Sequence, residues 1–168
     1  MNVELDSFHH SFIIYNSEFS SSDNPLREFP SVRHPTQFAD VGFMHVLVVE
    51  DDIRLRQVLV RLLRVSGFDR VEEASDGQEA LELLAASHPD LILTDNQMPR
   101  MDGLTFTRQL RATGNATPII MLSGHGDSHQ VVLAVKAGVN NYLPKPINAE
   151  ALFEKIAQTI PGAKINNN

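Results

Sequence analysis

Five polar side chains that could together bind a cation and a phosphoryl group stand at or just after the ends of short apolar runs. Glu50 and Asp51 follow one run, Asp95 follows another, Ser123 ends a third and Lys145 follows a fourth. Crowded carboxylates repel one another, and a hard cation such as Mg²⁺ neutralises them through oxygen ligands. A carboxylate beside such a cation can attack phosphorus and form an acyl phosphate. These residue types therefore predict phosphoryl transfer with Mg²⁺ as the cofactor, in which an ammonium and a hydroxyl share the phosphoryl oxygens.

The elements that must bring these residues together alternate between strand and helix along the chain. The predicted strands are His45–Val49, Arg70–Ala74, Leu91–Thr94, Pro118–Leu122 and Asn141–Leu143. The predicted helices are Ile53–Val65, a helix capped by Asp76 that runs to Ser87, Leu104–Ala112, Gln130–Ala137 and Ala149–Ile160. Strict alternation with short connections predicts a parallel sheet with helices on both faces. In such a sheet the site lies at the carboxyl ends of the strands, which is where all five polar residues fall.

The bulk composition is that of an ordinary globular domain and excludes several kinds of protein. The 168 residues are 42% hydrophobic and 21% charged, as expected for one domain. A net charge of −7 argues against a nucleic-acid surface, which needs clustered Lys and Arg. The chain has no cysteine, which removes disulfides and thiol chemistry and is compatible with a location in the cytoplasm. No apolar run approaches the roughly 20 residues that span a bilayer, so no membrane insertion is expected.

The sequence changes character at about residue 43. Residues 1–43 are rich in Ser, Asn, Pro and His and sustain neither helical nor strand periodicity. They are interpreted either as a disordered extension or as a segment outside the native protein, with Met44 as its first residue. The alternative is a docking or regulatory segment. Residues 44–163 are predicted to form the folded domain, and residues 164–168 a C-terminal tail.

Three sequence blocks in this domain carry a family resemblance. They are Val46–Asp52, Asp90–Gly103 and Tyr142–Ile147. In their order and at their strand ends they resemble the signature motifs of receiver domains of two-component response regulators, and the resemblance covers about residues 44–160. It implies a flavodoxin-like receiver fold, a doubly wound α/β architecture in which five parallel strands have the order 2-1-3-4-5 and helices cover both faces.

The resemblance also implies a role for each residue of the site. Asp95 would accept the phosphoryl group, and Lys145 would pair with Asp95 and then with its phosphate. The Ser123 hydroxyl would move to the phosphate after transfer, and the Tyr142 ring would change rotamer with it. The implied Mg²⁺ ligands are Glu50, Asp51, Asp95 and the backbone carbonyl of Gln97. The bond from Lys145 to Pro146 is typically cis in this family.

Departures from the family pattern concern four positions. Glu50 stands where Asp is commoner, and the longer side chain changes the metal site. Ser123 lacks the methyl group of the Thr that the family often has, which loosens the packing of the switch. Gln97 and His125 occupy variable positions that tune dephosphorylation, so the lifetime of the phosphorylated state does not follow from the sequence.

Other polar residues have simpler interpretations. Asp52 and Asp102 are predicted to cap the helices that follow them. Arg54, Arg61 and Arg64 lie roughly on one exposed helix face. That face is either merely solvated or a docking surface for the helical phosphodonor that receiver domains meet through their first helix.

The function expected from these features is that of a stand-alone receiver that is not an enzyme. It would accept a phosphoryl group from a sensor histidine kinase or a histidine phosphotransfer protein, and then bind a protein target or relay the group. The surface that changes would include Val131, Val135 and Tyr142. A phosphatase of the haloacid-dehalogenase type would need an Asp-x-Asp-x-Thr run after the first strand, and a flavodoxin would need a Ser/Thr/Gly-rich phosphate loop there. Glu50-Asp51-Asp52-Ile53 matches neither.

Overall fold

A computed structural model describes residues 36–39, 41–124, 128–160 and 164–167. The chain divides into two compact units, Met1–His34 and Pro35–Asn168. The first unit lies outside the described residues, as does most of the predicted extension. His125 also lies outside them.

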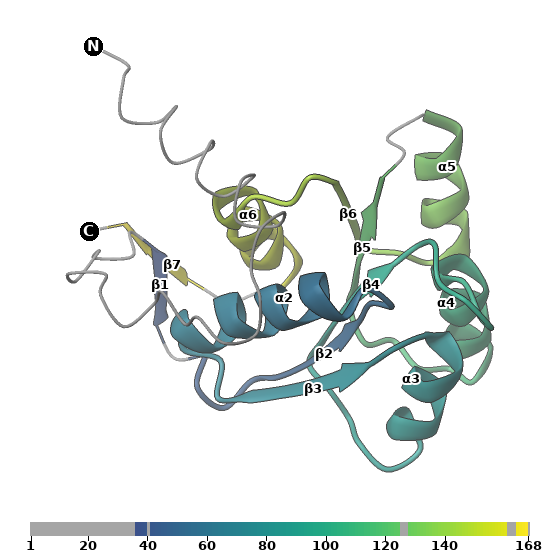
Figure 1. Ribbon diagram of the computed structural model, residues 1–168, viewed down its shortest axis with the longest axis horizontal. Coiled ribbons are helices and arrows are strands. Elements are labelled where there is room, and N and C mark those ends of the chain that lie inside the picture. The colour runs from purple at the N-terminus through teal and green to yellow at the C-terminus, as the bar shows by residue number, and fades with distance from the viewer. Residues whose placement is uncertain (1–35, 40, 125–127, 161–163, 168) are drawn as a thin grey trace. The chain divides into compact units, whose positions relative to one another are not determined.

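Five parallel strands form the central sheet of the second unit (Figure 1). They are β2 (His45–Val49), β3 (Arg70–Ala74), β4 (Leu91–Asp95), β5 (Ile119–Ser123) and β6 (Asn141–Pro144). Their order across the sheet is β3-β2-β4-β5-β6. Counted within this sheet alone, that is the predicted order 2-1-3-4-5, which is confirmed. The polar strand β3 lies at an edge, as its mixed composition favours.

Five helices connect the strands and cover the sheet. They are α2 (Ile53–Val65), α3 (Gly77–Leu84), α4 (Gly103–Ala112), α5 (Ser128–Ala137) and α6 (Ala149–Thr159). The carboxylates of Asp52, Asp76 and Asp102 accept hydrogen bonds from the first backbone N–H groups of α2, α3 and α4. Such caps satisfy donors that a helix leaves unpaired, and all three were predicted.

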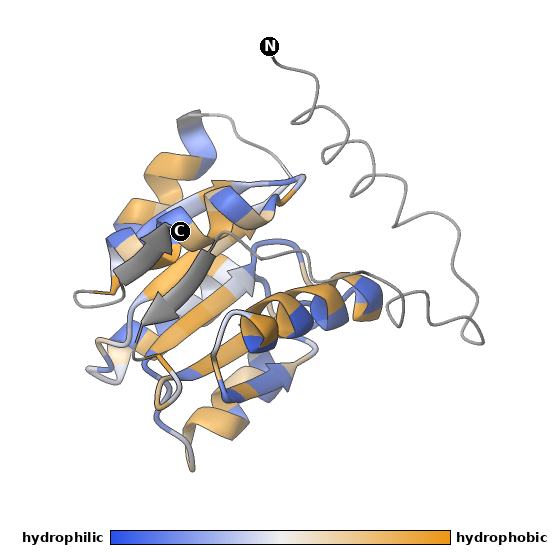
Figure 2. Ribbon diagram, turned by 90° about the vertical axis from the view of Figure 1, so that its left-hand side faces the viewer, coloured by the Kyte–Doolittle hydropathy of each residue, from blue (hydrophilic) through white to orange (hydrophobic). Residues whose placement is uncertain are grey.

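Each face of the sheet has its own hydrophobic core. Helices α2 and α6 pack on one face and α3, α4 and α5 on the other (Figure 1). Alternate residues of one strand point to opposite faces, so Val46 and Val48 of β2 enter the first core and Leu47 and Val49 enter the second. Because both faces are covered, β2, β4 and β5 are buried along their whole length and mostly apolar (Figure 2).

A second sheet of two strands was not predicted. Strand β1 (Thr36–Ala39) pairs antiparallel with β7 (Lys164–Asn167), and Thr36 is opposite Asn167. These residues come from the predicted extension and the predicted tail. Each strand has only four residues, and its partner is far away in the sequence, so local periodicity gives no signal for it.

Among the described residues, no helix has the length and apolarity that crossing a bilayer requires.

The start of α4 is pressed against the end of β4. A Cβ atom added to Gly103 would lie 2.2 Å from the backbone oxygen of Asp95. The Gly103 amide also donates to the backbone oxygen of Asn96 over 3.0 Å. Only glycine permits this approach, so Gly103 fixes the first turn of α4 directly beside Asp95.

Replacing this glycine should therefore destabilise the fold. In Gly103→Ala the new methyl group would collide with backbone, which cannot turn away as a side chain can. We expect the free energy of unfolding to fall by about 3 kcal/mol, which is at the upper end of the usual cost of adding a group to a well-packed interior. Urea denaturation measures it. The matched control is Gly124→Ala, because nothing lies within 4 Å of a Cβ at Gly124. Equal stabilities of the two variants would contradict the close approach.

Candidate functional site

The polar residues at the strand ends meet at one edge of the sheet. Glu50 follows β2, Asp95 ends β4, Ser123 ends β5 and Lys145 follows β6. The register places Asp95 opposite Leu122, and Ser123 opposite Pro144. Side chains that are up to 95 positions apart in the chain are thereby brought within reach of one another.

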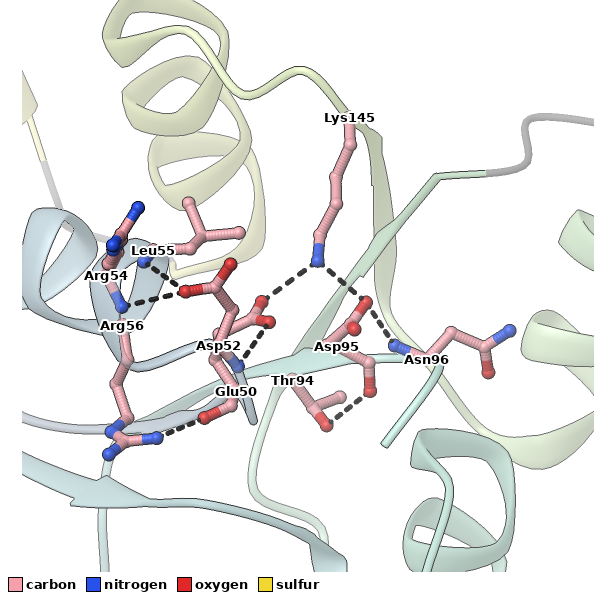
Figure 3. A network of polar contacts seen from close by, with 9 residues as sticks. All are labelled: Glu50, Asp52, Arg54, Leu55, Arg56, Thr94, Asp95, Asn96 and Lys145. Atoms are coloured by element: carbon pink, nitrogen blue, oxygen red, sulfur yellow. Dashed lines mark hydrogen bonds and ion pairs between the residues drawn. The ribbon is translucent and has the colours of Figure 1, made fainter. Parts of the chain in front are cut away.

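Lys145 lies between two of the acids. Its Nζ is 3.0 Å from Oε2 of Glu50 and 3.1 Å from Oδ1 of Asp95 (Figure 3). The resemblance implied the contact with Asp95, whereas the contact with Glu50 was not predicted. The peptide bond between Lys145 and Pro146 is cis, as expected.

Three carboxylates form a cluster that fits a hard cation. Glu50, Asp51 and Asp95 each offer an oxygen, and these atoms lie within 4.8 Å of one another. Glu50 is 1% exposed and Asp95 is 5% exposed, while Asp51 is open to solvent. A set of oxygen donors without His or Cys suits Mg²⁺. Because Asp51 is exposed, an ion could enter from the solvent and keep part of its hydration shell.

Crowding changes the acid–base behaviour of the cluster. Burial and the nearby Asp95 charge raise the pKa of Glu50 from 4.5 to about 7, although Lys145 partly opposes the rise. Burial alone would lower the pKa of Lys145, but its contacts with Glu50 and Asp95 outweigh burial and raise that pKa. Without a cation, the single ammonium therefore leaves the cluster short of positive charge.

Backbone contacts hold the acids in place. Oδ1 of Asp95 accepts a hydrogen bond from the Asn96 amide over 2.7 Å, and the Thr94 hydroxyl donates to the backbone oxygen of Asp95 over 3.0 Å. Arg56 donates through Nη1 to the backbone oxygen of Glu50 over 2.5 Å (Figure 3). Sequence reasoning missed Arg56. Its position in the second turn of a helix after the acidic pair was the available signal, but many solvated arginines share it.

The two residues of the implied switch lie on neighbouring strands. Ser123 is buried at the end of β5, and Tyr142 is half-buried on β6, where it packs against the core beneath α3, α4 and α5. The register places Tyr142 opposite Met121, two residues before Ser123. Their coupled movement stays a prediction.

The remaining predicted residues lie outside this cluster. Gln97 is exposed in the loop after β4, and the role of its carbonyl as a metal ligand stays a prediction. On α5, Val131 is half-buried and Val135 is 65% exposed. The three arginines of the predicted α2 docking face are all exposed: Arg54, Arg61 and Arg64.

Comparison with protein families identifies the domain. The family model of the response regulator receiver domain matches residues 46–157. Among curated proteins, response regulator MprA of Mycolicibacterium vanbaalenii is 42% identical over 113 residues, which are 67% of this chain and 48% of that protein. MprA of Mycobacterium ulcerans is 40% identical over 124 residues, 74% of this chain and 53% of that protein. The chain thus spans about half the length of the curated relatives it matches.

Solved structures give the same result. The chemotaxis response regulator CheY4 of Vibrio cholerae is 32% identical with a TM-score of 0.66, over 70% of this chain and 98% of that one. The receiver domain of the Francisella response regulator 1452 is also 32% identical, with a TM-score of 0.62, over 65% of this chain and 89% of that one. Both likenesses cover nearly all of the compared domain.

The pKa of Glu50 predicts how stability depends on pH in the absence of metal. A carboxyl whose pKa is raised on folding stabilises the protein below its unfolded pKa of about 4.5, and this contribution is lost as the pH rises through about 7. Glu50→Gln cannot titrate. With EDTA present, the free energy of unfolding of the wild type should therefore fall relative to the variant by roughly 2 to 3 kcal/mol between about pH 5 and pH 8. Urea denaturation across this range measures the difference. If the free energy of unfolding of the wild type and of Glu50→Gln changed with pH in the same way, the pKa of Glu50 would not be raised on folding.

Proposed function

The chain belongs to the response regulator receiver domain family, and from this premise we propose that Asp95 accepts a phosphoryl group from a histidine kinase or a histidine phosphotransfer protein. The observation that carries the proposal is the position of Asp95. It is a buried carboxylate, 3.1 Å from an ammonium and in a cluster with two further acids, at the strand ends where sites of this fold occur.

The reaction would transfer the group from a phosphohistidine. A carboxylate oxygen of Asp95 attacks phosphorus, the new P–O bond forms as the P–N bond breaks, and the imidazole leaves with the electron pair. Phosphoryl transfer depends mainly on positioning the attacking oxygen and the phosphorus, and on neutralising the charge of the phosphoryl oxygens. Lys145 holds the Asp95 carboxylate before transfer and is within reach of the new phosphoryl oxygens after it.

Mg²⁺ would be held by Glu50, Asp51 and Asp95, with the Gln97 carbonyl as a further ligand. When bound, the ion supplies positive charge that neutralises the acids and the developing phosphoryl charge. Glu50 is buried and fixed by Lys145, whereas Asp51 faces solvent and admits the ion.

Phosphorylation would then shift the domain between two states. We assign the change to Ser123, Tyr142 and the surface that includes Val131 and Val135, with a protein target that the present residues do not identify. The domain would act as a phosphoryl acceptor and not as an enzyme with a separate substrate. Action without an attached output domain and location in the cytoplasm stay predictions.

The direct test is the intact mass after incubation with acetyl phosphate and Mg²⁺. We expect one phosphoryl adduct on the wild type, none on Asp95→Asn, and none on the wild type when EDTA is present. The amide of Asn cannot form an acyl phosphate under these conditions, and without the cation the acids repel the donor.

The matched control is Asp69→Asn. This variant removes an exposed carboxylate just before β3, at the amino-terminal ends of the strands and therefore away from the site. It should be phosphorylated like the wild type. An adduct that persists in Asp95→Asn would place the acceptor elsewhere. If the wild type is phosphorylated neither by acetyl phosphate nor by a phosphorylated histidine phosphotransfer protein, the proposed function is wrong.

A further inference from the structure

The loop between β4 and α4 begins directly after Asp95, the proposed acceptor at the end of β4. Backbone contacts fix this end of the loop. The Asn96 amide donates to the backbone oxygen of Leu122 over 3.0 Å and also to Oδ1 of Asp95. At the other end, Gly103 is pressed against Asp95. The loop therefore begins and ends beside Asp95, and its conformation contributes to the surroundings of that residue.

The middle of this loop lies against the N-terminus of α3. The Gly77 amide donates to the backbone oxygen of Met101 over 3.3 Å. A Cβ added to Gly77 would lie 2.9 Å from Cγ of Met101 and 2.8 Å from Cβ of Phe106. Glycine at this position thus lets the loop and the start of α4 approach α3 closely.

An ion pair joins the same two segments. Nε and Nη2 of Arg100 both donate to Oδ2 of Asp76. Asp76 is a rigid anchor, because it is 2% exposed and its other oxygen, Oδ1, caps α3 through the amides of Gln78 at 2.8 Å and Glu79 at 3.1 Å. One buried carboxylate therefore both starts a helix and holds the loop that follows Asp95.

The backbone of Arg100 has an unusual conformation. Its φ is +60°, and it is the only non-glycine with positive φ among the described residues. Side chains with a Cβ adopt this left-handed conformation reluctantly, and Asn or Gly would adopt it more easily. In this conformation the arginine side chain meets Asp76.

We infer that Arg100 is a positioning residue for the metal site: through Asp76 it pins the loop of residues 96–101 to α3 and so holds Asp95 and the Gln97 carbonyl in the arrangement that binds Mg²⁺. The inference rests on the proposed function, since it concerns the same cation and the same acceptor. Arg100 itself touches neither phosphate nor metal in this account. It acts through the loop.

The sign of the effect separates this role from simple electrostatics. Arg100 is a cation on the loop that follows Asp95, so Coulomb repulsion alone predicts that its removal strengthens Mg²⁺ binding. Loss of positioning predicts that its removal weakens Mg²⁺ binding. The variant Arg100→Gly suits the test because glycine adopts positive φ without strain, so the side chain is removed while the backbone conformation can be kept.

The experiment measures the Mg²⁺ dissociation constant from NMR shifts of the backbone amides in unphosphorylated protein. We expect Arg100→Gly to bind Mg²⁺ about 10-fold more weakly than the wild type, as found when groups that orient metal ligands are removed. The variant loses the partner of a buried carboxylate, so thermal unfolding is measured to verify that it is still folded at the temperature of the titration. In metal-free protein, the Met101 and Gly103 amides should exchange with solvent faster than in the wild type.

Two further variants sharpen the result. Asp76→Asn keeps a capping oxygen for α3 but removes the charge that holds Arg100, so it should weaken Mg²⁺ binding in the same direction. Because both residues act through one contact, the double variant should be no weaker than the worse single variant. Arg108→Gln removes an exposed cation from α4 and reports the Coulomb effect alone, which should leave binding equal or slightly stronger.

Unchanged or tighter Mg²⁺ binding in Arg100→Gly would overturn the inference while leaving the proposed function intact. Additive losses in the double variant would also overturn it, since the two residues would then act separately. Wild-type protein that binds no Mg²⁺ would overturn the proposed function, and this inference with it.

Discussion

Repulsion among carboxylates at the edge of the sheet is the constraint on which the site depends. Parallel strands end side by side, so Glu50, Asp51 and Asp95 cannot avoid one another. Lys145 supplies one positive charge against three negative ones, and burial makes the deficit costly, as the raised pKa of Glu50 shows. A cation bound among these carboxylates would relieve their repulsion, as the proposed function requires.

The rest of the fold keeps these charges from moving apart. Arg56 fixes the backbone at Glu50, the Asn96 amide fixes the Asp95 carboxylate, and Gly103 lets α4 approach Asp95 closely. A charge added at Asp95 therefore cannot be absorbed by a local shift of that residue. It must be met by neighbours, and the buried Ser123 at the end of β5 is the one predicted to respond.

Much of this arrangement could be predicted from the sequence, because its signals are local. Apolar runs, helical spacing and capping acids predicted all five strands of the main sheet and all five helices, and the order of residues at the strand ends predicted which side chains meet. Contacts between distant side chains gave no such signal. The pairing of Lys145 with Glu50, the pairing of Arg100 with Asp76 and the β1–β7 sheet all depend on tertiary geometry. The positive φ of Arg100 is equally invisible, since Arg carries no preference for it.

An NMR titration of the Glu50 carboxyl carbon in the wild type, with and without Mg²⁺, would test directly whether the crowded carboxylates bind a cation. We expect a pKa of about 7 in metal-free protein, and a value well below that when Mg²⁺ is saturating, because a bound cation favours the charged carboxylate. A pKa near 4.5 without metal, or one that Mg²⁺ leaves unchanged, would contradict the claim that a crowded acidic cluster forms a cation site at Asp95.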